Sequence, residues 1–150
     1  DLEEVANIFY NYYVPKGDSP YTLYNSATIA LYDTDEIEDI AVVCEEIFTQ
    51  NREKMVSVSR SSVQPYFRLG QDYFFDLEHY ISKIATPSQL LKFQKESGEA
   101  VILKKATKNF LDIPIDNFSG LSVYIPKIPG GDLETFYRTF EWNQRTKLVN

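Results

Sequence analysis

The chain has 150 residues, of which 43% are hydrophobic and 15% aromatic, and this is enough to bury a core as one domain. Its formal net charge of -7 argues against a nucleic-acid partner, which requires a clustered Lys and Arg surface. The single cysteine, Cys44, excludes an internal disulfide and a metal site of several thiolates, and no apolar run approaches the ~18 residues that span a bilayer.

The first element in chain order is a helix. Residues Leu2–Tyr13 carry apolar side chains at helical spacing, which predicts a stripe that faces a core. A turn-rich loop follows over residues 15–20, and the apolar run Thr28–Tyr32 predicts a short buried strand. Because the chain begins at Asp1 and its only methionine is Met55, we expect a processed product or a piece of a longer polypeptide.

A second helix is predicted over residues 34–51. Asp33 and Glu36 have the spacing of a capping box, and an apolar stripe from Ile37 to Phe48 follows. Another helix is expected around residues 55–63, before Pro65. A short helix is expected from the apolar positions between residues 74 and 84, with Asp76 as its N-terminal cap.

The second half of the chain alternates helix and strand signals. Thr86, Pro87 and Gln89 form a strong helix start, and the helix should extend to about residue 105. Residues 106–111 and 120–126 could pair as a loose hairpin, and a last helix is predicted over residues 133–142. The predicted fold class is therefore α+β, mainly helical with a few short strands.

Nucleophilic chemistry would require Cys44 and His79, the only cysteine and the only histidine. Cys44 lies in the middle of a predicted helix on its apolar stripe, where a thiol behaves as a small buried hydrophobe. Helical spacing turns His79 away from the core face toward solvent. The patterns therefore favour a buried thiol and a surface histidine over a catalytic dyad.

Two acidic clusters and several aromatic pairs suggest other sites. Asp33, Asp35 and Glu36 could bind calcium, although helix capping already explains two of the three. Asp72, Asp76 and Glu78 could supply paired carboxylates for hydrolysis. The aromatic pairs could line a sugar- or peptide-binding groove, but at helical spacing such residues more often form core: Phe9, Tyr10, Tyr12, Tyr13, Tyr66, Phe67, Tyr73, Phe74 and Phe75.

Four segments follow one another in a distinctive order. They are Thr-Ile-Ala-Leu-Tyr-Asp-Thr at 28–34 before an amphipathic helix, Phe-Phe-Asp-Leu-Glu-His-Tyr-Ile at 74–81, Ser-Gly-Leu-Ser-Val-Tyr-Ile-Pro at 119–126 and Phe-Glu-Trp-Asn at 140–143. This order resembles the C-terminal part of clostripain-like cysteine peptidases. The resemblance spans nearly the whole chain. It implies a caspase/gingipain-like α/β peptidase fold and a secreted or cell-envelope endopeptidase that cleaves after Arg or Lys, often activated by self-cleavage.

The same resemblance places the catalytic machinery elsewhere. In the family, a His-Gly strand end supplies the general base and an Asp-x-Cys-Leu-Met-type strand end supplies the nucleophile, and neither motif occurs here. No catalytic, cofactor-binding or metal-binding role therefore transfers to any residue of this chain, and whether the chain is itself an enzyme stays open. Residues 1–35 would end the catalytic-sheet region and residues 36–150 would form one helical C-terminal module.

The implied partners are the upstream catalytic portion of the same polypeptide and, for the full enzyme, protein or peptide substrates. Two other functions remain possible from sequence. The chain could be a stand-alone peptide- or glycan-binding module with an aromatic surface, or a small hydrolase that uses carboxylates such as Asp72 and Asp76.

Overall fold

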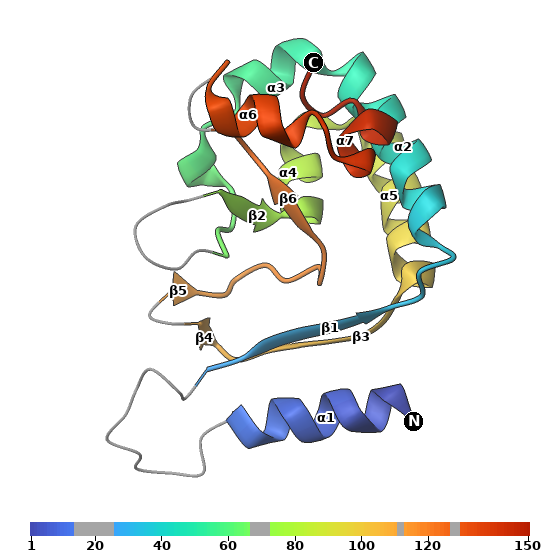
Figure 1. The fold of residues 1–150 in the computed structure, drawn as a ribbon, viewed down its shortest axis with the longest axis vertical. Coiled ribbons are helices and arrows are strands. Elements are labelled where there is room, and N and C mark those ends of the chain that lie inside the picture. The colour runs from blue at the N-terminus through green and yellow to red at the C-terminus, as the bar shows by residue number, and fades with distance from the viewer. Residues whose placement is uncertain (14–25, 67–72, 111–112, 127–129) are drawn as a thin grey trace.

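The computed structural model describes residues 1–13, 26–66, 73–110, 113–126 and 130–150, in which helices predominate and the strands form three short two-stranded sheets (Figure 1). The helices are α1 Leu2–Tyr13, α2 Ile37–Gln50, α3 Arg52–Ser57, the 3-10 turn η2 Arg60–Ser62, α4 Leu77–Ile84, α5 Pro87–Ala100, α6 Asp132–Tyr137 and α7 Glu141–Thr146. The strands are β1 Thr28–Tyr32, β2 Phe74–Asp76, β3 Val101–Ala106, β4 Asn109–Phe110, β5 Ile113–Pro114 and β6 Ser122–Tyr124. The expected mainly helical chain with a few short strands is confirmed.

The core lies where α2, α4, α5 and α7 meet the β2–β6 pair. The apolar stripe predicted on α2 faces inward, and its members Ile40, Cys44, Ile47 and Phe48 are fully buried. Phe75 from β2 and Phe93 from α5 fill the space between these elements. Buried aromatic and branched side chains of this kind contribute most of the apolar area removed from water on folding.

Two of the predicted helix starts are confirmed by their hydrogen bonds. The Asp76 carboxylate caps α4 by accepting the backbone N–H of His79 at 2.8 Å. At the start of α5, the Thr86 hydroxyl accepts the Gln89 N–H, and the Gln89 side chain accepts the Thr86 N–H. Each bond satisfies a donor that the first helical turn leaves unpaired.

The capping box predicted for α2 is wrong. The helix begins at Ile37, its cap Glu36 makes no side-chain capping bond, and Asp33 Oδ1 instead accepts the backbone N–H of Asp35 at 3.0 Å. Such a local bond holds a turn before the helix and competes with capping.

The β1–β3 pair lies apart from the helical core and has α1 beside it (Figure 1). Its strands are antiparallel, with Thr28 opposite Ala106 and Leu31 opposite Leu103. Strand β1 is only half-buried, rather than buried as predicted, because its one described partner is β3. The α5 helix also ends at Ala100 instead of about residue 105, since residues 101–106 pair with β1.

The other strand pairings differ from the predicted hairpin. Strand β6 pairs with β2, so that Phe75 lies opposite Val123, whereas β4 pairs with β5. Residues 74–76 form a strand that leads directly into α4. The single helices expected over residues 55–63 and 133–142 are each divided in two, as α3 with η2 and as α6 with α7.

Gly120 joins the two halves of the fold. It has a positive φ of 86°, and its carbonyl accepts a hydrogen bond from the Tyr32 hydroxyl at 2.7 Å. A Cβ atom placed on Gly120 would lie 3.1 Å from the Cβ of Ala30 and 3.4 Å from that of Lys104. The segment that leads into β6 therefore crosses the face of the β1–β3 pair at Gly120. Any larger residue at this position would have to displace its neighbours.

Replacing Gly120 with alanine should destabilise the chain by about 2 kcal/mol, because the substitution adds both left-handed backbone strain and the short contact with Ala30. Urea unfolding followed by circular dichroism measures this. The matched control is Gly98→Ala in α5, where a Cβ meets nothing within 4 Å and should stabilise the helix by about 0.5–1 kcal/mol. Equal changes in the free energy of unfolding for the two substitutions would contradict the close contact between Gly120 and Ala30.

Candidate functional site

Cys44 has no features of a nucleophile. Its side chain is 0% exposed within the apolar core, and burial raises the pKa of the thiol far above its ordinary value. A thiol in this setting stays protonated at neutral pH. The predicted buried thiol is confirmed.

His79 lies on α4 and lines a cleft instead of facing open solvent. The side chain is half-buried, and its Nδ1 accepts the backbone N–H of Gln64 at 3.0 Å, so the expected surface position is only partly correct. Burial lowers the pKa of the imidazole and Lys83 lowers it further, while Asp76 raises it. Among the described residues, no hydrogen bond joins His79 to Cys44, so the structure does not form the dyad.

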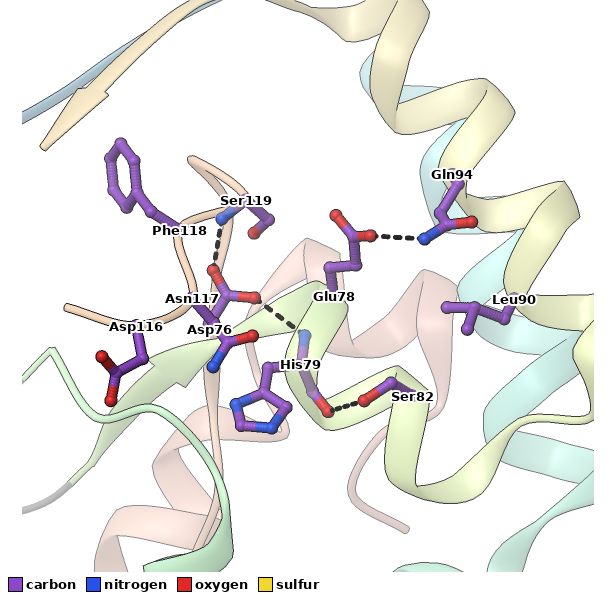
Figure 2. Close-up of a pocket in the computed structure, with 10 residues that line it drawn as sticks. All are labelled: Asp76, Glu78, His79, Ser82, Leu90, Gln94, Asp116, Asn117, Phe118 and Ser119. Carbon is purple, nitrogen blue, oxygen red and sulfur yellow. Dashed lines mark hydrogen bonds between the residues drawn. The ribbon is translucent and has the colours of Figure 1, made fainter.

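The cleft has a volume of about 290 Å³, and Asp76 lies at its inner end (Figure 2). Asp76 is 1% exposed, and both of its carboxylate oxygens are occupied. Oδ1 caps α4, and Oδ2 accepts the Ser119 N–H at 2.6 Å and the Tyr66 hydroxyl at 2.5 Å. A buried carboxylate that accepts three hydrogen bonds from separate segments holds those segments together.

Of the other two predicted carboxylates, the structure describes only Glu78. Glu78 reaches the cleft but accepts a hydrogen bond from Gln94 Nε2 at 2.6 Å, as Figure 2 shows. Asp116 also lines the cleft, from the segment after β5. Asp72 lies outside the described residues.

No calcium centre is formed by the residues that the structure describes. Asp33, Asp35 and Glu36 precede α2, where Asp33 is engaged by the backbone of Asp35. Across the described ranges, no group of three or more His, Cys, Asp or Glu is arranged to hold a metal ion. Calcium binding by these three residues stays a prediction.

A second hollow, of about 410 Å³, lies beside β1 and is here called the β1 groove. It is lined by Thr28, Ile29, Ala30, Tyr32, Tyr66, Phe74, Phe118, Gly120 and Ser122. Most of these side chains are apolar or aromatic, and the Tyr66 and Phe118 rings pack edge to face at 5.8 Å. An apolar hollow of this size is large enough to accept protein side chains.

One edge of β1 is also open. Thr107 N–H donates to Ala27 O, so Ala27 directs its backbone groups toward the β3 side. Successive residues of an antiparallel strand alternate in this direction, and Thr28 and Ala30 therefore direct their N–H and C=O groups to the opposite edge. No strand among the described residues pairs with that edge. Open edges of this kind are sites for adding a further strand.

Helix α1 leaves its apolar stripe uncovered, contrary to the expectation that the stripe faces a core. Leu2, Val5, Ile8, Phe9 and Tyr12 are 49 to 81% exposed, and Ala6 is the only buried residue of the helix. A different side of α1 contacts the sheet, where Lys105 from β3 binds Asn7 Oδ1 and its ammonium lies 5.8 Å from the Tyr10 ring centroid. The stripe thus projects beside β1 without a described partner.

The predicted aromatic residues are spread over several places, with Tyr66 and Phe74 in the β1 groove and Phe75 in the core. Phe9, Tyr12 and Tyr13 contact one another on α1, with ring centroids 4.8 and 5.1 Å apart. Tyr73 continues through Tyr124 to Tyr137 and Phe140 of the C-terminal helices, which forms a row of packed rings. Phe67 lies outside the described residues. No single groove collects the aromatic residues that the sequence suggested.

Gln64 was not predicted as a functional residue, and the structure places it where three segments meet. Its side-chain oxygen accepts the N–H groups of Asp116 and Asn117 at 2.9 and 3.2 Å, and its Nε2 donates to the Pro114 carbonyl at 2.9 Å. Gln64, which precedes Pro65, belongs to no hydrophobic periodicity and to no motif that would predict its role. Only its depth of burial reveals the role.

Comparison with known proteins gives a consistent result at the level of structure. No protein-family model matches the chain, and no curated protein matches it. An inactive zymogen of a C11 protease from Parabacteroides distasonis superposes with a TM-score of 0.79 at 25% identity, over 95% of this chain and 42% of that chain.

Two structures from Bacteroides thetaiotaomicron agree with the first. A clostripain bound to a peptide inhibitor has a TM-score of 0.76 at 22% identity, over 97% of this chain and 64% of that one. A secreted C11 cysteine protease bound to an irreversible peptide inhibitor has a TM-score of 0.70 at 21% identity, over 97% and 42%.

The chain therefore shares the fold of a region of C11, clostripain-family cysteine proteases, and the resemblance predicted from sequence is confirmed. It spans only 42 to 64% of the length of these three protease chains. Within the described ranges, no helix is long and apolar enough to cross a membrane.

Replacing Asp76 with alanine should destabilise the chain by about 3 kcal/mol, because the change removes a helix cap and leaves the buried Ser119 N–H without its acceptor. Urea unfolding measures the loss. Glu78→Ala is the control, since Glu78 lines the same cleft but its loss should cost less than about 1 kcal/mol. An Asp76→Ala chain as stable as the control would refute the structural role of Asp76.

Proposed function

We propose that this chain is the non-catalytic C-terminal part of a clostripain-like cysteine endopeptidase, which cleaves after Arg or Lys when complete. In this proposal, residues 1–35 end the catalytic-sheet region of a caspase-like fold, and residues 36–150 form the helical C-terminal module. The partner is the upstream catalytic portion of the same polypeptide. The enzyme acts on protein or peptide substrates outside the cell or at the cell envelope, in keeping with the secreted C11 protease among the similar structures.

The observation that supports the proposal most directly is that three features at or beside β1 lack a partner. The strand has an open edge, one of its faces opens into the β1 groove, and the apolar stripe of α1 projects beside it. Uncovered apolar surface beside an unpaired strand is typical of a sheet whose remaining strands come from elsewhere. The similar protease chains are longer than this one, which supports an upstream portion as that source.

The chain's own residues support a non-catalytic role. The Cys44 thiol is buried, and the His79 Nδ1 is occupied by a backbone N–H, so neither could form the base and nucleophile of a peptidase in this arrangement. The chain would instead hold the catalytic strands in register, as the supporting residues of a preorganised site do.

The alternative of a stand-alone peptide- or glycan-binding module receives less support. Such a module would expose aromatic rings without an adjoining aliphatic patch. On α1, however, the exposed Phe9 and Tyr12 are accompanied by exposed Leu2, Val5 and Ile8. A mixed patch of this kind is typical of an interface with another part of a core.

The longer polypeptide that contains this chain should cleave fluorogenic peptides that have Arg or Lys before the scissile bond. The 150 residues alone should not cleave them. The activity of the longer polypeptide should survive Cys44→Ala, because the buried Cys44 thiol takes no part in the reaction. Activity of the 150-residue chain that is abolished by Cys44→Ala or His79→Ala would refute the non-catalytic assignment.

A charged residue on the α1 stripe should weaken docking of the upstream portion without destabilising the fold of this chain. We expect Val5→Glu to change the stability of the chain by less than about 0.5 kcal/mol, because Val5 is already exposed. In the longer polypeptide the same change should lower activity at least about tenfold, since it would bury an unpaired carboxylate in the interface. Thermal unfolding and peptide cleavage measure the two effects.

The matched control is Val56→Glu on α3, where the valine is 90% exposed and outside the proposed interface. It should leave both stability and activity unchanged. Equal activity of the Val5→Glu and Val56→Glu polypeptides would count against the interface on α1.

A further inference from the structure

His79 and Gln64 form a hydrogen bond whose direction depends on protonation. The Gln64 backbone N–H donates to the His79 Nδ1 at 3.0 Å. A ring nitrogen that accepts a hydrogen bond carries no proton, so this contact exists only with the neutral imidazole, whose proton is on Nε2. Protonation of Nδ1 would place two donors face to face and break the contact.

Gln64 transmits this contact to the segment that follows β5. Its side chain binds the backbone of Pro114, Asp116 and Asn117, which leads directly to Phe118. The Phe118 ring packs on Tyr66, two residues after Gln64, and both rings line the β1 groove. Gln64 therefore helps to hold one wall of the groove, together with Asp76, whose Oδ2 accepts the Tyr66 hydroxyl and the Ser119 N–H.

We propose that His79 is a pH-sensitive latch for the Tyr66–Phe118 wall of the β1 groove. With a neutral imidazole, the latch is closed and Gln64 holds residues 114–117 in place. When the imidazole gains a proton, the Gln64 N–H loses its acceptor, and the segment that ends at Phe118 loosens. Pairing of residues 64–66 with β2 through Asp76 N–H and Tyr66 N–H remains, so the change is local.

The charges around His79 set the direction of its titration. Two charged groups act on it, the Asp76 carboxylate at the helix cap and Lys83 on the next turn, while Glu78 and Asp116 line the same cleft. Burial and Lys83 lower the pKa of His79, and the opposing effect of Asp76 is smaller. The folded chain therefore binds fewer protons than the unfolded chain, and stability falls as the pH drops below about 6.5, the ordinary value for histidine.

The consequence for a protease rests on the proposed function. If the catalytic portion docks at the β1 groove, acidification loosens one wall of its docking surface. A protease assembled through this groove would be held most firmly near neutral pH. The latch itself belongs to this chain and can be tested without any peptidase assay.

The test is nuclear magnetic resonance on the 150-residue chain labelled with ¹⁵N. At pH 7.0 we expect a coupling across the hydrogen bond between the Gln64 amide nitrogen and the His79 Nδ1, and its progressive weakening as the pH is lowered to 5.5 and His79 begins to gain a proton. Protection of the Gln64, Asp116 and Asn117 amides from exchange should fall at least about fivefold, the factor for losing one hydrogen bond of about 1 kcal/mol. His79 is the only histidine, which leaves it the one side chain with an ordinary pKa in this window.

Two variants separate the latch from a general effect of acid. His79→Gln offers a side-chain oxygen that can accept the Gln64 N–H but does not titrate, so its amide protection should not depend on pH. His79→Phe removes the acceptor, and the same amides should exchange rapidly at both pH values. Exchange by mass spectrometry in the longer polypeptide gives the same comparison for peptides that contain residues 64 and 114–117. Unchanged protection in the natural chain, or an equal fall in His79→Gln, would overturn the latch, and neither result would bear on peptidase activity.

Discussion

The buried carboxylate of Asp76 is the contact on which the packing of this chain depends most. It ends β2, caps α4, and binds the Ser119 N–H and the Tyr66 hydroxyl, so three segments distant in sequence share one pair of oxygens. Three hydrogen bonds offset the cost of burying this polar group. This arrangement aligns the approach to β6, and through Gly120 it sets the distance between the helical core and the β1–β3 pair.

The contrast between the two ends of the molecule indicates how such a chain could act. Around Asp76 the carboxylate has three hydrogen-bond donors, and the apolar side chains of the core are buried. Around β1 an open edge, an apolar groove and an uncovered helical stripe lie together. A rigid, complete half that presents an incomplete surface is suited to organising another part of a protein. The likeness to part of longer C11 protease chains is consistent with that arrangement.

Local sequence patterns predicted the local features well. The cap at Asp76, the capping box at Thr86 and the buried stripe of α2 all follow from residues within one or two turns. Features that depend on distant partners were missed. Residues 101–106 could continue a helix by their own preference, and only pairing with β1 makes them a strand. The exposure of the α1 stripe and the hydrogen bonds of Gln64 could not be predicted either, because periodicity does not show which residues lie opposite a side chain.

The pairing of β1 with β3 also has a consequence for folding order. Ala27 and Thr107, which are 80 positions apart in sequence, are joined by hydrogen bonds, and the chain between them contains α2, α4 and α5. Closing so long a loop costs entropy before any strand contact forms. Contacts between the enclosed helices are nearer in sequence and should form first, which brings the two strands together. The β1–β3 pair would then form late, with α1 added last and released first on partial unfolding.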